Sequence, residues 1–164
     1  MSDAQIDPDA FEDPLSNYEP AVYASELHRV LAEEPVSAIQ SQPFVKVSVD
    51  ASIQEAMQAL SESEVSSLLV VDKEKLVGIF TERDVLENIA EHLPQLSSTP
   101  VREVMTSDPT VVYESDPVGT AVAAIAIAGH RHVPVLRIDG SVLGIVSPRR
   151  VLECLNKHVH ESPS

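Results

Sequence analysis

The apolar positions of the chain follow one pattern twice. Apolar residues recur at the spacing of an amphipathic helix at Ile53, Ala56, Met57 and Leu60, and again at Val118, Ala121, Val122 and Ile125. Each helical stretch precedes two short apolar runs, at 67–71 and 76–80 in the first copy and at 133–138 and 142–146 in the second. These runs are continuous rather than alternating, which is typical of strands that are buried on both faces. A final helical pattern closes each copy, at 81–91 and at 147–157.

The segments before each helix repeat as well. Val36–Ile39 matches Val101–Val104 as a short helical turn, and Phe44–Val47 matches Pro109–Val112 as a short strand. One such half would leave an apolar sheet face open to water, so the two halves are expected to pack together. The predicted fold is α/β (α+β), with two pseudo-symmetric repeats packed sheet to sheet around a pseudo-twofold axis and with the helices outside.

A further helix is expected before the repeats. Ala21–Glu34 places Tyr23, Leu27, Val30 and Leu31 on one face and is ended by Pro35. This apolar stripe must pack either on the following domain or on a second subunit. The predicted organisation is an acidic extended or disordered tail (1–20), the N-terminal helix (21–35), repeat 1 (36–92), a linker (93–100), repeat 2 (101–158) and a short tail (159–164).

Charge and cysteine content narrow the classes of partner. The 26 acidic and 11 basic residues give a net charge of −15, which makes nucleic acid and anionic membranes poor partners. Because Cys154 is the single cysteine, an intrachain disulfide and a thiolate metal cluster are excluded. It lies in an apolar helical pattern and is expected to be a buried structural thiol. The acidic N-terminus does not resemble a signal peptide, and no apolar stretch is long enough to span a bilayer. We expect a soluble cytoplasmic protein.

The most informative motif ends the second apolar run of each copy. Gly78-Ile-Phe-Thr-Glu-Arg-Asp84 returns 66 residues later as Gly144-Ile-Val-Ser-Pro-Arg-Arg150. Thr81 and Ser147 suit the start of a helix, and Thr81 with Asp84 resembles a capping box, so capping alone explains the hydroxyls. The second copy departs from the first because Arg150 stands where the first copy has Asp84.

The ordered series of elements, together with Ser-Leu-Leu-Val-Val-Asp72, its counterpart ending at Asp139, and the Gly78–Asp84 motif, resembles a tandem CBS-domain protein. This repeat pair, of the cystathionine β-synthase type, is also called a Bateman module. The resemblance covers roughly 36–155 and implies a disc-like module that dimerises and binds adenine nucleotides or adenosyl ligands between its repeats.

The resemblance also implies roles for individual residues. In one pocket, Asp84 and Thr81 match ribose contacts, Arg83, Arg131 and His132 match phosphate contacts, and Met105, Thr110 and Val111 line the base slot. In the second pocket, Ser147, Arg149 and Arg150 face a base slot made by Ile39, Phe44 and Val45. Glu64 and Val65 are taken as the counterparts of the Arg131–His132 pair. Alternatives stay open, because the apolar residues also suit a plain core and the arginines also suit surface salt bridges.

The sequence carries no catalytic constellation, such as a Gly-rich phosphate loop or a Cys/His pair, and no metal site, since His130 and His132 have no third ligand nearby. We therefore expect no enzyme, but a stand-alone regulatory homodimer that binds AMP, ADP or ATP, with Mg²⁺ accompanying ATP, and that signals to an effector protein by changing shape or assembly. A pocket with Arg150 would be non-nucleotide, phosphate-selective or empty. The alternative is a CBS-pair scaffold that binds no ligand and mediates protein–protein contacts.

Overall fold

The computed structural model describes residues 19–127 and 129–160. The predicted tail therefore lies largely outside the described residues. The first half contains α1 (Glu26–Glu33), the 3-10 helix η2 (Val36–Ala38), β1 (Lys46–Ser48), α2 (Ile53–Glu62), β2 (Ser67–Asp72) and β3 (Lys75–Thr81). A helical segment follows as α3 (Glu82–Asp84), a π-helix (Val85–Ile89), a 3-10 helix (Ala90–His92) and α4 (Leu93–Leu96). The second half contains the 3-10 helix η5 (Val101–Glu103), β4 (Thr106–Ser107), β5 (Val112–Tyr113), α5 (Val118–Ala126), β6 (Val133–Leu136), β7 (Val142–Val146) and α6 (Pro148–His160).

Two element boundaries differ from those predicted. The N-terminal helix begins at Glu26 rather than Ala21, because Ser25 is extended and caps it by accepting a hydrogen bond from the His28 amide. The segment predicted to be a linker, 93–100, begins with the helical turn α4, whose Leu93 and Leu96 pack against the core of the first half. A run of short helical turns therefore continues from Glu82 to Leu96, with changes of helix type at Val85, Ala90 and Leu93.

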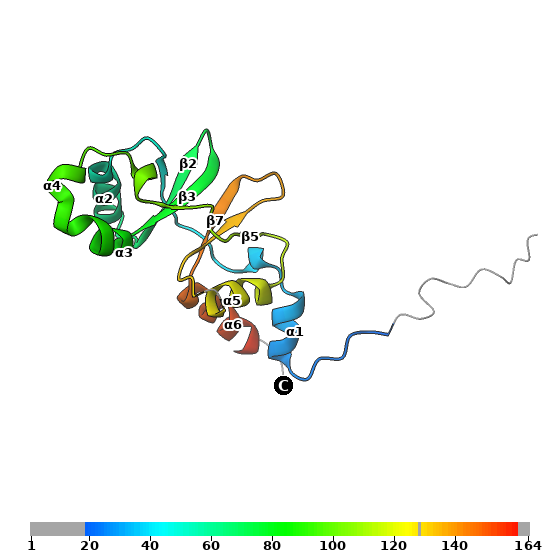
Figure 1. The fold of residues 1–164 in the computed structure, drawn as a ribbon. Coiled ribbons are helices and arrows are strands. Elements are labelled where there is room, and N and C mark those ends of the chain that lie inside the picture. Colours follow the sequence, from blue (N-terminus) through cyan, green and yellow to red (C-terminus); the bar gives the residue numbers. More distant parts are fainter. Residues whose placement is uncertain (1–18, 128, 161–164) are drawn as a thin grey trace, which may run out of the picture.

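The strands form two sheets, in the orders β1-β2-β3-β4 and β5-β6-β7. In each sheet the first strand runs parallel to the second, and the second and third form an antiparallel hairpin. Leu69 and Ile79 of the first sheet pack with Ile145 of the second in one apolar cluster. The predicted packing of sheet against sheet is therefore confirmed, and Figure 1 shows the two hairpins side by side.

The opposite faces of the sheets carry the helices. Alternate strand residues Leu68, Val70 and Phe80 are fully buried in a cluster with α2 residues, while Val133, Val135 and Val146 are fully buried in a second cluster with α5 and α6. Since successive strand residues point to opposite faces, burial on both faces requires the continuous apolar runs seen in the sequence.

Each half contributes its leading segment to the core of the other half. Val36 and Ile39 of the first half are buried in the cluster of the second, and Val101 of the second half is buried in the cluster of the first. The amide of Val36 donates to Asp116 O (2.7 Å), and the amide of Val101 donates to Ala51 O at the same distance. The two halves are thus interlocked by a reciprocal exchange.

Helix α1 packs on the second half. Val30 is fully buried, and Leu31 lies against the core that contains α5 and α6. Gly119 of α5 permits this approach, since a Cβ there would lie 2.8 Å from Leu31 O. Val30 and Leu31 of the predicted apolar stripe therefore pack on the following domain, whereas Leu27 is exposed. Figure 1 shows α1 beside α5 and α6.

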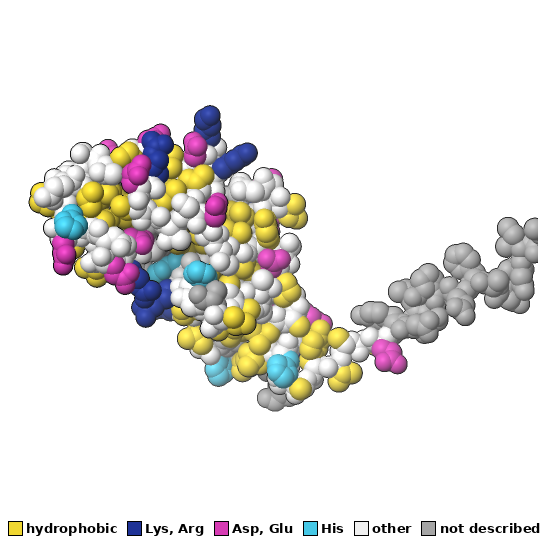
Figure 2. All heavy atoms as spheres, in the orientation of Figure 1, with side chains coloured by type: hydrophobic (Ala, Val, Ile, Leu, Met, Phe, Trp, Pro, Cys, Tyr) yellow, Lys and Arg dark blue, Asp and Glu magenta, His cyan; other side chains and the backbone are white. Residues whose placement is uncertain are grey.

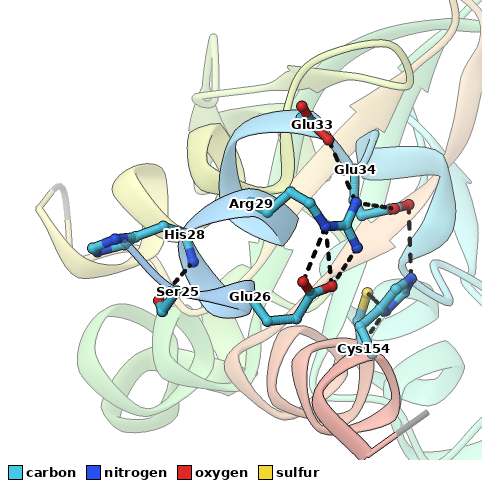
Figure 3. A network of polar contacts seen from close by, with 8 residues as sticks. Ser25, Glu26, His28, Arg29, Glu33, Glu34 and Cys154 are labelled. Atoms are coloured by element: carbon cyan, nitrogen blue, oxygen red, sulfur yellow. Dashed lines mark hydrogen bonds and ion pairs between the residues drawn. The ribbon is translucent and has the colours of Figure 1, made fainter. Parts of the chain in front are cut away.

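Polar contacts reinforce the junction between α1 and α6 (Figure 3). Arg29 pairs with Glu26 and Glu33 on α1, and Glu34 Oε2 lies 3.6 Å from His158 Nε2 on α6. Cys154 is buried on the same helix, as predicted. Burial raises the pKa of the Cys154 thiol, and the charge of Glu34 raises it further, so the thiol stays protonated and unreactive at neutral pH.

Within the described ranges, no helix combines the length and apolar character needed to cross a membrane.

Candidate ligand-binding cleft

A cavity of about 520 Å³ lies between the two halves, beside the start of α3. Of the residues that the sequence predicts for the first pocket, Thr81, Arg83, Asp84, Thr110, Arg131 and His132 line it together. The remaining lining residues are Ser66, Ile79, Glu82, Leu86, Glu87, Thr106, Pro109, Gly129 and His130. Both halves therefore contribute walls, and Figure 2 shows basic and histidine side chains gathered where the halves meet.

Asp84 is held rigidly at one wall of the cavity. Its Oδ2 accepts hydrogen bonds from the Thr81 amide (2.8 Å) and the Thr81 hydroxyl (2.9 Å), and the Asp84 amide donates to Thr81 Oγ1 (3.3 Å). This is the capping box expected from the sequence. Among the described residues no donor reaches Oδ1, so the half-buried carboxylate still offers one oxygen to a ligand.

His132 joins the two halves across the cavity. Its Nε2 lies 2.9 Å from Ser66 Oγ, within hydrogen-bond distance. Burial lowers the pKa of His132, and the charges of Arg131 and Arg150 lower it further, against the opposing charge of Glu82. The imidazole is therefore neutral at pH 7 and offers a ligand a hydrogen bond rather than a charge.

Positive charge in the cavity comes from two exposed arginines on opposite halves, Arg83 and Arg131. Arg83 Nε lies 3.9 Å from Glu87 Oε1, which is a loose surface pair that a ligand can displace. Thr110 Oγ1 lies 3.1 Å from His130 Nε2, so Thr110 meets a polar partner rather than an apolar slot.

The strand register corrects one alignment made from the sequence. Leu68 pairs with Phe80 in the first sheet, and Val133 pairs with Val146 in the second. Since Phe80 and Val146 are equivalent positions, Leu68 corresponds to Val133. The counterparts of Arg131 and His132 are therefore Ser66 and Ser67, and the assignment to Glu64 and Val65 was wrong.

Comparison with known proteins agrees with this architecture. The model of the CBS domain matches twice, at residues 36–91 and 101–157. A 17.7 kDa protein of Acidianus ambivalens is 32% identical over 121 residues, which are 73% of this chain and 72% of that protein. Two CBS domain-containing proteins of Arabidopsis thaliana are 34% identical over 107 residues, or 62% of this chain, but the match spans only 19% of their length.

The chain belongs to the CBS-domain family. A CBS domain protein of Pyrobaculum aerophilum, solved in complex with AMP, is 26% identical to it with a TM-score of 0.65, over 75% of this chain and 98% of that one.

Asp84 and its counterpart in the second CBS repeat, Arg150, make different contacts. Arg150, the counterpart of Asp84, donates from Nη1 to Ile145 O (2.6 Å) and from Nη2 to Pro43 O (2.9 Å). Ser147 Oγ accepts a long hydrogen bond from the Arg150 amide (3.5 Å). The side chain of Arg149 is 88% exposed and binds Glu153, so it points away from the repeat interface.

The residues predicted to line each base slot do not lie together in one cavity. Met105 packs against Gly78 and the core of the first CBS repeat, and neither Met105 nor Val111 lines the cavity. In the second slot, Ile39 is buried in the core of the second repeat, Phe44 packs between the sheets, and Val45 packs on the core of the first repeat. A base-binding role for these residues stays a prediction, and for most of them the structure shows a core contact instead.

Some lining residues were missed because their signal depends on tertiary structure. Ser66 and Pro109 stand in loops without a periodic pattern, and only the packing of the CBS repeats brings them to one cavity. Ile79 could have been found from the sequence, since it lies two residues before Thr81 and strand residues two apart share a face.

The depressed pKa of His132 predicts a loss of stability in mild acid. A histidine that resists protonation in the folded state takes up its proton more readily when unfolded, so the free energy of unfolding falls as the pH drops below about 6.5. Urea denaturation at pH 7.5, 6.5 and 5.5 should show this slope. His132→Gln should flatten it, whereas the same change at exposed His92 should leave it unaltered. An equal slope in wild type and His132→Gln would contradict the assignment.

Proposed function

We propose that this CBS pair is a regulatory module rather than an enzyme, and that it binds an adenine nucleotide or adenosyl ligand in the Asp84 cleft. The observation that carries the proposal is the carboxylate of Asp84, fixed by Thr81 at a cavity to which both repeats contribute. The volume of about 520 Å³ lies within the range usual for small-molecule sites. The AMP complex of the Pyrobaculum aerophilum relative supports the ligand class.

The chemistry of the wall suits a ribose. An ionised carboxylate only accepts hydrogen bonds, and the Oδ1 of Asp84 has two lone pairs for the hydroxyls of a diol. The hydroxyl of Thr81 already donates to Asp84 and accepts from its amide. Thr81 therefore positions the carboxylate, and any contact it makes with ligand uses its remaining lone pair.

The two arginines suit the phosphate end. Arg83 comes from the first repeat and Arg131 from the second, so one phosphate group held by both would connect the two walls. His132, as a neutral imidazole, adds a hydrogen bond. A ligand that touches both repeats favours one relative arrangement of them by differential affinity, which is the physical basis of a signal.

The experiment is calorimetric titration of the full chain with AMP, ADP, ATP and S-adenosylmethionine, each with and without Mg²⁺. We expect micromolar binding of at least one of them. Absence of heat with all four, together with unchanged Tm values, would contradict the proposal.

A scaffold that binds no ligand is the second candidate. It is favoured by the Arg150 contacts, which show that the repeat interface can be held by the chain itself, and by the exposed Leu86 (74%) and its counterpart Leu152 (59%). These apolar side chains on equivalent helices also suit the homodimer that we propose. Molar mass from light scattering, measured with and without nucleotide, distinguishes ligand-dependent from constitutive assembly.

The N-terminal helix offers a further prediction. A truncation that starts at Val36 uncovers the core that Val30 and Leu31 bury, and should lower the free energy of unfolding by about 3 kcal/mol. A truncation that starts at Ala21 keeps α1 and serves as the control. Urea denaturation measures the change in stability, and light scattering measures any change in oligomeric state. A Val36 truncation with wild-type stability and the wild-type oligomeric state would show that α1 is neither a structural nor a transmitting element.

A further inference from the structure

In the second CBS repeat, a single side chain connects the two repeats by hydrogen bonds. Arg150 occupies the position equivalent to Asp84, since each is the third residue of its own helix, α6 and α3 respectively. Asp84 forms its side-chain hydrogen bonds with Thr81 at its own helix start, whereas the guanidinium of Arg150 reaches two carbonyl oxygens on different segments. Ile145 O belongs to β7 of the second repeat, and Pro43 O belongs to the leading segment of the first.

These contacts are part of a continuous junction between the two repeats. The Ile145 amide donates to Ser41 O (2.9 Å), and Gln42 Nε2 donates to Leu143 O (3.4 Å). Gly144 lies so close to Ser41 that an added Cβ would overlap the Ser41 carbonyl oxygen. The backbone hydrogen bond between Ile145 and Ser41 already joins the two repeats here, and the bond from Arg150 to Pro43 O adds a second connection beside it.

The two equivalent positions are opposite in hydrogen-bond chemistry. A carboxylate only accepts, so Asp84 needs a donor from outside for its free oxygen. A guanidinium only donates, and the carbonyls of Ile145 and Pro43 supply the acceptors from within the chain. The half-buried Arg150 is thus satisfied without a ligand, while Asp84 is not.

We propose that Arg150 is the internal occupant of the second cleft. It bridges the two repeats permanently on that side and leaves the Asp84 cleft as the single ligand site of each chain. The ligand stoichiometry rests on the function proposed above, but the bridge does not. A stoichiometry of one ligand per chain thus follows from the difference between Asp84 in the first repeat and Arg150 in the second.

The test measures the bridge and the stoichiometry separately, on the full chain. Amide hydrogen exchange of Ile145, followed by NMR, should become at least tenfold faster in Arg150→Ala, which corresponds to about 1.4 kcal/mol. The same increase is expected in Arg150→Lys, because lysine keeps the charge but cannot form both guanidinium hydrogen bonds. Arg149→Ala, next to it on the exposed face, should leave this rate unchanged. Equilibrium dialysis with AMP should give one molecule per wild-type chain.

The outcomes are distinguishable. Unchanged Ile145 exchange in both Arg150 variants would overturn the bridge. Two AMP molecules per wild-type chain would overturn the closed second cleft while supporting nucleotide binding. Faster exchange with no AMP bound would support the bridge, and it would count against the proposed function if ADP, ATP and S-adenosylmethionine also fail to bind.

Discussion

Asp84→Ala is expected to weaken binding of the nucleotide about 10- to 150-fold, which corresponds to about 1.5–3 kcal/mol. The reason is the loss of a fixed, ionised acceptor for the ribose hydroxyls at the cavity wall. Folding stability should fall by only about 1 kcal/mol, since the variant also loses one capping box. Calorimetric titration and urea denaturation of the same preparation measure the two effects.

The chain provides a matched control for this variant. Glu55 forms the same capping box with Ser52 at the start of α2, with hydrogen bonds of 2.7 and 3.1 Å. It does not line the cavity, so Glu55→Ala should cost similar stability and leave the affinity unchanged. If Asp84→Ala loses stability but keeps its affinity, Asp84 is a helix cap and the ribose assignment is wrong.

Gly144→Ala should be the most destabilising single substitution proposed, at about 3 kcal/mol. A methyl group there would overlap both the carbonyl oxygen and the side chain of Ser41, on the segment that the first repeat inserts beside β7. Because one of the overlapping atoms belongs to the backbone, no side-chain rotation can relieve the clash. Urea denaturation should show a lower midpoint with a similar slope.

Two further variants isolate the cause. Gly140→Ala adds a Cβ that meets nothing within 4 Å, so its cost of about 1 kcal/mol reflects only the positive φ of 84°. Ser41→Gly combined with Gly144→Ala removes the Ser41 side chain but keeps its carbonyl, and should remain destabilised. Full recovery in that double variant would place the clash in the side chain and weaken the account of the repeat interface.

The layered fold was predictable because it follows from burial. The unbroken apolar runs at 68–71 and 142–146 require cover on both faces, and two such hairpins in one chain can cover each other. The exchange of leading segments was not predictable. The apolar residues Val36 and Val101 indicate burial, but nothing local to either indicates which half buries it.

In the candidate site, too, the local features were predictable from the sequence and the tertiary contacts were not. Thr81 and Asp84 are three residues apart at a helix start, so their geometry is local and the sequence predicted the capping box correctly. The position of Arg131 relative to the first repeat depended on an alignment through a loop, where no buried residue fixes the register, and it was misassigned. The bonds of Arg150 to Pro43 O, 107 residues away in the chain, lie beyond any local pattern.

Nucleotide binding between the CBS repeats at Asp84 can be tested directly in solution. The most direct measurement is an NMR titration of the full, isotope-labelled chain with the nucleotide that gives the largest calorimetric heat. We expect the largest amide shifts at 81–87 and 129–132, on both walls of the cleft, and small shifts at 147–150. Shifts centred on 147–150, or none at 81–87, would contradict it.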